Sequence, residues 1–242
     1  MRTISTYQPS LVDQVVEAIT SEIVSGELPS NSRLIQEDLA RAYGVSRQPV
    51  QQALLLLRSR GLVRDAEGRG LTVAPLDVDF IQNLYEIRAA MEGLAAQLAA
   101  RKGSDQARLR GPKLIEIGRE AIGKGALDDQ IAADFTFHAF LSELSGNPLI
   151  NETTAPHWPS LRRVMGEVLR DDIAMPHSIW DEHAAILDAV IAGQSDKAEA
   201  LARAHIMRAA GVFVARLRAQ QHSRNNDQDR RRINRKGRKN PK

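Results

Sequence analysis

The sequence contains no cysteine, and only 4% of its 242 residues are aromatic. The absence of cysteine excludes disulfide bonds, thiolate metal ligands and a cysteine nucleophile. It is consistent with a reducing compartment, and we expect a cytoplasmic, nucleoid-associated protein. No uncharged apolar run reaches the ~18 residues that a transmembrane helix needs. The first residues also lack the apolar segment of a signal peptide.

Most of the chain has no excess of positive charge, although the net charge is +3 and the isoelectric point is about 9.4. Residues 222–242 hold nine Lys/Arg and two Asp, a net charge of +7, which leaves −4 on residues 1–221. This last segment has one aliphatic residue, Ile233, and cannot bury enough apolar surface to offset chain entropy. We therefore predict a disordered basic tail at 222–242. The overall charge is no evidence that the folded part binds DNA.

The first part of the chain, 8–74, has the pattern of a winged helix-turn-helix domain. Ser10 and Asp13 form a capping-box pattern before a helix with apolar residues at every fourth position. A short helix is expected over 35–43, and a third helix begins after Ser46. Two β-branched segments, 62–64 and 71–73, then predict a hairpin.

The start of the third helix carries residues suited to reading DNA. They are Ser46, Arg47, Gln48 and Gln51. A recognition helix contacts base edges with its first turns, where Arg and Gln make bidentate contacts to guanine and adenine. Six Arg against two acidic residues between Arg41 and Gly70 give a local charge of +4, which phosphate binding requires. A helical hairpin with an ordinary solvated face is the alternative that the pattern leaves open.

A longer motif resembles a known family. The stretch LIQEDLARAYGVSRQPVQQAL from Leu34 to Leu54, followed by GLV at 61–63 and GRG at 68–70, is similar to the DNA-binding domain of GntR-family transcription regulators. The resemblance implies that Arg47 contacts a base or phosphate, and that Arg69 and Gly70 form a wing tip in the minor groove. Two departures prevent the operator sequence from being carried over. Gln51 and Gln52 stand where the family usually has Arg-Glu, and Gln48 replaces a common Thr.

The rest of the ordered chain, 75–221, is rich in Ala and Leu with helical periodicity and almost no strand signal. Helices are expected over about 79–100, 105–123, 128–145, 147–169, 179–192 and 195–220. A helical bundle buries their apolar faces most simply. The predicted fold class is therefore mainly α: a winged helix-turn-helix domain followed by an all-α domain.

Four side chains of this all-α domain form a candidate metal site. Asp134 and His138 lie one helical turn apart on one face, and His183 and His205 complete a set of three nitrogen donors and one oxygen donor. Such a set suits Zn, Ni, Mn or Fe. Taken alone, histidines in helices are also commonly packed or solvated.

The order DFTFH at 134–138, SGNP at 145–148, DEH at 181–183 and AH at 204–205 resembles the effector domain of the FadR-like (FCD) subgroup. The resemblance implies one divalent metal ion bound by Asp134, His138, His183 and His205 inside six or seven helices. It also implies that Arg88 meets a carboxylate of the effector. An exposed ion pair with Glu92, four residues on, is the alternative for Arg88.

These observations predict a homodimeric repressor that binds double-stranded operator DNA. We expect a small organic or sugar acid to bind at the metal and change operator affinity. We expect no membrane partner, no catalytic residue and no enzymatic activity. The competing interpretation is a metal-dependent hydrolase or redox enzyme that uses the Asp and three His.

Overall fold

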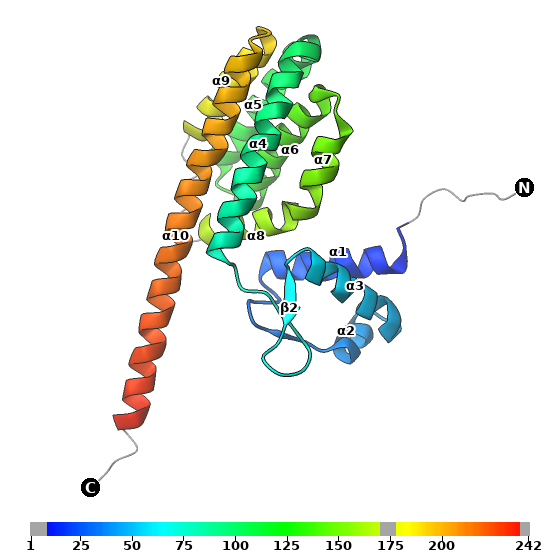
Figure 1. Cartoon of the computed structure of the whole chain (residues 1–242), viewed down its shortest axis with the longest axis vertical. Coiled ribbons are helices and arrows are strands. Elements are labelled where there is room, and N and C mark those ends of the chain that lie inside the picture. The colour runs from blue at the N-terminus through cyan, green and yellow to red at the C-terminus, as the bar shows by residue number, and fades with distance from the viewer. Residues whose placement is uncertain (1–8, 170–177, 238–242) are drawn as a thin grey trace, which may run out of the picture. The chain divides into compact units, whose positions relative to one another are not determined.

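The computed structural model describes residues 9–169 and 178–237, which are mostly helical with three short strands (Figure 1). The chain forms two compact units. The first comprises the residues up to Leu76 together with Thr154–Gly166, and the second comprises Asp77–Thr153 and the residues from Glu167 onward. The mainly α fold is thus confirmed. The predicted division at 74/75 lies two residues from the observed one, but 154–166 belongs with the first unit and not with the second.

The first unit contains a winged helix-turn-helix. Its helices are α1 (Leu11–Ser25), α2 (Gln36–Ala42) and α3 (Arg47–Ser59). Its strands are β1 (Arg33–Leu34), β2 (Val63–Asp65) and β3 (Leu71–Val73), all antiparallel in the order β1-β3-β2. The hairpin prediction missed β1, because a strand of two residues is too short to show a periodic pattern.

Local signals explain where α1 begins. The backbone N–H of Asp13 donates to Ser10 Oγ at 3.1 Å, and the backbone N–H of Ser10 donates to the Asp13 carboxylate at 3.0 Å. This capping box satisfies backbone donors that a helix start leaves free. The apolar side of α1, with Ile19 fully buried, packs in one core with α3 residues such as Val50 and Leu54.

The second unit is an all-α assembly. Its helices are α4 (Val78–Lys102), α5 (Ser104–Lys124), α6 (Leu127–Ser145), α7 (Pro148–Thr154), α9 (Ser178–Ile191) and α10 (Ser195–Gly237). A 3-10 turn at Ala155–His157 and helix α8 (Trp158–Leu169) connect α7 to the later part of the chain. Within the described residues, no helix combines the length and the apolar character needed to cross a membrane.

Two helix predictions differ from the structure. The single helix expected over 147–169 is divided into α7, the 3-10 turn and α8, because Pro156 and Pro159 lack the N–H of a continuous helix and restrict the residues before them. Residues 222–237, expected to be disordered, continue α10 to Gly237. Many of them are Arg, Lys and Gln, which are good helix formers, and α10 already supplies the nucleus. Residues 238–242 lie outside the described residues.

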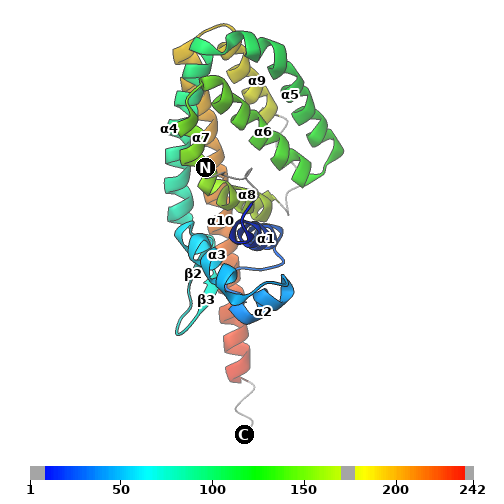
Figure 2. The ribbon, with the colours of Figure 1, turned by 90° about the vertical axis from the view of Figure 1, so that its right-hand side faces the viewer.

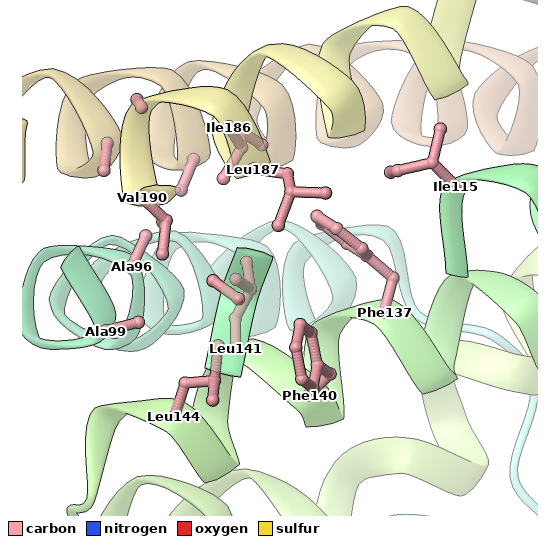
Figure 3. Close-up of a cluster of buried hydrophobic side chains, with 14 of the residues drawn as sticks. Ala96, Ala99, Ile115, Phe137, Phe140, Leu141, Leu144, Ile186, Leu187 and Val190 are labelled. Atoms are coloured by element: carbon pink, nitrogen blue, oxygen red, sulfur yellow. The ribbon is translucent and has the colours of Figure 1, made fainter. Parts of the chain in front are cut away.

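Helices α4, α6, α9 and α10 share the core of the second unit. Ile186, Leu187 and Val190 of α9 lie over Ala96 of α4 and Phe137 of α6 (Figure 3). Helix α10 runs antiparallel to α4 (Figures 1 and 2). This packing brings residues from four separated segments to one buried place.

Candidate metal centre and nucleic-acid interface

The four predicted metal ligands meet inside the second unit. Asp134 and His138 come from α6, His183 from α9 and His205 from α10. All four are buried, and each offers a ligand atom within 4.8 Å of the others. Asp134 Oδ1 lies 3.5 Å from His183 Nε2 and 3.7 Å from His138 Nε2, and the Nε2 atoms of His183 and His205 are 3.1 Å apart.

Two further carboxylates contact the Nδ1 atoms of two of these histidines. Glu92 of α4 contacts His138 Nδ1, and Glu182 of α9 accepts from His205 Nδ1 at 2.7 Å. Arg208 Nε donates to the other oxygen of Glu182 at 2.8 Å. A carboxylate on Nδ1 fixes the ring so that Nε2 is free to bind a metal ion. Both histidines therefore present Nε2 to the cluster.

Sequence reasoning assigned neither of these carboxylates to the metal site. Glu92 was considered only as a partner of Arg88. Glu182 adjoins His183 in the sequence, but it contacts His205, 23 residues away on another helix. Residues next to each other on a helix do not face the same way, so no spacing in the sequence indicates this pair. Its position beside His183 was the only signal.

Burial and charge shift the pKa values of the cluster strongly. Burial favours the neutral form of Asp134. The positive charges near it, of which that of His138 has the largest effect, nevertheless hold the pKa of Asp134 well below the usual range. Burial would lower the pKa of His138, but the negative charges of Glu92 and Asp134 raise it to about 9. Burial lowers the pKa values of His183 and His205. These shifts favour neutral imidazoles at His183 and His205 and an ionised Asp134, which are the forms that bind metal.

The donor set fits a divalent ion. Three imidazoles and one carboxylate suit Zn, Ni, Mn or Fe, and all four side chains are withdrawn from water. His138 Nε2 makes no hydrogen bond within the protein, which leaves this buried ring nitrogen available as a ligand. An ion bound here would act as a Lewis acid that accepts oxygen atoms of a further ligand. It would also replace the proton on His138.

Arg88 lies beside this cluster. Its Nε donates to Glu92 at 2.5 Å, and one of its terminal nitrogens lies 3.8 Å from Asp134 Oδ2. The ion pair with Glu92 therefore exists, but it is buried and not exposed, with the two side chains 7% and 13% accessible. The Arg88 guanidinium also lies 5.7 Å from the centre of the Tyr85 ring. A permanent positive charge thus adjoins the metal ligands.

The predicted DNA contacts lie on the surface of the first unit. Ser46, Arg47, Gln48 and Gln51 are all exposed at the beginning of α3. Ser46 is the N-cap residue, but its side chain makes no capping hydrogen bond. Arg47 donates to Glu37 at 2.5 Å, with both side chains more than half exposed. Such a surface pair contributes only ~0–1 kcal/mol, so a phosphate can displace Glu37.

The predicted wing is the loop between β2 and β3. Gly70 has φ of 103°, a backbone conformation that side chains disfavour, and its carbonyl accepts from the N–H of Ala66 at 3.0 Å. Arg69 is exposed, and its carbonyl accepts from the Arg33 guanidinium at 3.2 Å. A shallow hollow of about 300 Å³ is lined by Arg33, Arg47 and Gly70, among others. Arg33, which sequence reasoning did not single out, thus adds positive charge between wing and helix.

Comparisons with known proteins find a family match for each of the two parts of the chain. Residues 11–73 match the family "Bacterial regulatory proteins, gntR family", and residues 83–208 match the FCD domain. LutR of Bacillus subtilis (strain 168), an HTH-type transcriptional regulator, is 28% identical over 76% of this chain and 92% of its own length. An uncharacterized HTH-type transcriptional regulator of Streptomyces ambofaciens is 30% identical over 81% of this chain and 82% of its own length.

Other matches are shorter or show the fold alone. YdhC of Bacillus subtilis (strain 168), an uncharacterized HTH-type transcriptional regulator, is 27% identical over 55% of this chain, and the match spans 60% of that protein's length. The structure of McbR/YncC of E. coli has a TM-score of 0.72 and 22% identity, and covers 89% of this chain and 100% of its own. At that identity the likeness concerns the fold.

Proposed function

The chain belongs to the GntR family of bacterial regulatory proteins and carries an FCD domain, and on this premise we propose that it is a repressor whose operator affinity is controlled by a small organic or sugar acid bound at a metal ion. Its relatives are HTH-type transcriptional regulators, and the first unit, whose residues 11–73 match the gntR family, is the part that we expect to bind DNA. The acid, the metal and the sign of regulation are the proposed part.

One observation carries the proposal. The buried Arg88 guanidinium lies 3.8 Å from Asp134, a residue of the candidate metal tetrad. A guanidinium binds a carboxylate through two parallel hydrogen bonds, while a metal ion accepts its neighbouring oxygen atoms. An α-hydroxy or sugar acid offers both groups. The Nε atom of Arg88 is paired with Glu92, so the acid would meet the terminal nitrogens of the guanidinium.

The effector can act only through a difference in its affinity for the DNA-bound and free states. Acid and operator should therefore weaken each other's binding by the same factor. In the homodimer that we propose, the acid changes the packing of the helices and thereby the spacing of two DNA-binding units on a palindromic operator. A saturating effector that leaves operator affinity unchanged would refute this mechanism.

A thermal-shift screen of carboxylic acids, with and without a chelator, tests where the effector binds. We expect an acid that raises the melting temperature only when metal is present. His183→Ala should remove both metal binding and the response to the acid. An intact response in a protein that has lost its metal, whether by His183→Ala or by chelation of the unaltered chain, would contradict binding at the metal.

The DNA contact has its own test. Arg47→Ala should lower the affinity for an operator selected from random duplexes by about 1–3 kcal/mol, or roughly 5- to 150-fold, because it removes one base or phosphate contact. Arg101→Ala in the second unit removes the same charge from an exposed position and should leave operator affinity unchanged. Unfolding curves should show both variants folded. Full operator affinity in Arg47→Ala would refute the assigned role.

The metalloenzyme alternative has less support. The relatives are transcriptional regulators. Glu92 and Glu182, the two carboxylates that contact the histidines of the tetrad, are engaged by Arg88 and His138 and by His205 and Arg208, which disfavours a role as a general base. A regulator acts on the chromosome, so the proposal places this protein in the cytoplasm.

A further inference from the structure

The last part of α10 is a strongly basic segment. Residues 222–242 carry nine Lys/Arg and two Asp, a net charge of +7, whereas the rest of the chain carries −4. The structure continues α10 through this segment to Gly237, roughly 24 Å beyond residue 221 at the helical rise per residue. Among the residues whose burial is described, Leu217 is the last of α10 in the buried core.

The pairing of α4 with α10 determines where this extension emerges. Gln97 of α4 donates to Glu199 of α10, and the Tyr85 ring lies 5.9 Å from that of Phe213. The two helices are therefore antiparallel, and the first turn of α4 lies opposite about residue 220. The chain enters α4 from the winged helix through Leu76 and Asp77. The basic extension thus leaves the second unit at the end where α4 begins, which is the end that the chain enters from Leu76.

We propose that the last part of α10, residues 222–237 with six Lys/Arg and two Asp, forms a second, sequence-independent DNA-binding element that contacts phosphates of the duplex bound by the first unit. This inference rests on the proposed function, because it assumes that the first unit binds DNA. An excess of Lys and Arg is what phosphate binding requires. The same charge could attract an anionic membrane, but Ile233 is the only large apolar residue of the segment. A helix that lies on a membrane needs a whole apolar face.

The test compares binding of the full chain and its variants to a labelled duplex of arbitrary sequence between 50 and 200 mM salt. Each phosphate contact contributes ~0.9 to the slope of log affinity against log salt. If Arg230, Arg231 and Arg232 each contact a phosphate, replacing all three by Gln lowers that slope by about 2.7 per chain. The affinity of the full chain should then fall about 40-fold more over this salt range than that of the triple variant. Gln keeps the helix propensity, so circular dichroism at 222 nm should not change.

Two further variants separate charge from helix length. A chain that ends at Gln221 should lose at least as much slope as the triple variant. Asp227→Asn with Asp229→Asn leaves the length unchanged and removes two negative charges, so it should raise affinity at low salt. Equal slopes in the full chain, the triple variant and the shortened chain would overturn the inference, and so would binding of the segment to phosphatidylglycerol vesicles with an unchanged DNA slope. If the full chain binds no duplex at 50 mM salt, the proposed function itself fails. If it binds with a slope that all variants share, only the present inference fails.

Discussion

Gly118→Ala in α5 should destabilise the second unit although it adds a single methyl group in a helix. A Cβ atom at this position would lie 1.9 Å from Cζ2 and 2.1 Å from Cη2 of Trp180. Carbon atoms in contact are normally ~3.5–4.0 Å apart, so the indole or the helix must move by more than 1 Å, on the order of 1.5 Å. Trp180 is 1% exposed and has little room to move.

The magnitude follows from two opposing effects. Replacing Gly by Ala in a helix normally stabilises it by roughly 0.5–1 kcal/mol. Overpacking of a well-filled core costs about 1–3 kcal/mol. The clash involves a rigid ring that packs edge-on against Phe137 and against His183, with ring centres 6.3 and 4.6 Å away, so we expect the upper part of that range. The net loss should be about 1–2 kcal/mol, a fall in melting temperature of ~2–8 °C.

The assay is urea unfolding followed by circular dichroism at 222 nm, together with a metal titration. Gly123→Ala is the matched control, because it makes the same change in the same helix with no other atom within 4 Å of the added Cβ. It should be neutral or up to ~1 kcal/mol more stable than the unaltered chain. Displacement of the indole against His183 should also weaken metal binding in Gly118→Ala but not in Gly123→Ala.

Trp180→Phe provides the decisive comparison. It removes the six-membered part of the indole that meets the new methyl group. Gly118→Ala and Trp180→Phe should therefore be less destabilising together than the sum of the two single changes, with a coupling of about 0.5–3 kcal/mol. If Gly118→Ala is as stable as Gly123→Ala, or if the two changes are additive, the close approach of α5 and α9 at this point is wrong.

Three other predictions concern the metal site and α1. Glu182→Gln should weaken metal binding by about 10- to 100-fold in a competition titration, because the His205 ring loses its charged acceptor. Arg208→Gln should have a smaller effect. Equal metal affinity in Glu182→Gln and the unaltered chain would refute the positioning role of Glu182. A chelator should lower the melting temperature by ~5–10 °C, since a ligand present at 100 times its Kd stabilises by about 2.7 kcal/mol; an unchanged melting temperature would mean that the tetrad holds no metal ion. Ser10→Ala should cost the first unit about 1 kcal/mol through loss of the capping box, whereas Ser21→Ala, exposed within the same helix, should be neutral or slightly stabilising; equal stabilities in urea would contradict this.

The sequence predicted best those features that depend on neighbouring residues. The capping box at Ser10 and the beginnings of the helices of the first unit follow from interactions over three or four positions, and they appear as expected. The family resemblance is confirmed by matches to both halves of the chain. The pair Asp134 and His138 also follows from helical geometry alone, because residues four apart share a face.

Features that join distant segments needed the tertiary structure. The two-residue strand β1 exists only because β3 pairs with it. Residues 154–166 belong with the first unit although the chain places them between helices of the second. The extension of α10 to Gly237 depends on a helix that is already formed, and composition alone therefore indicated disorder.

The candidate metal site shows the same division. By itself the sequence determined which residues could donate to a metal and which two of them share a face, because donor chemistry and helical period are local properties. Only the packing of α4, α6, α9 and α10 decided that the four ligands meet, that Glu92 and Glu182 stand behind two of them, and that the Arg88–Glu92 pair is buried. Because the chain has no cysteine, a metal ion at this site must be held by imidazole and carboxylate groups. Burial then decides which of those groups carry charge, and burial is a property of the folded chain.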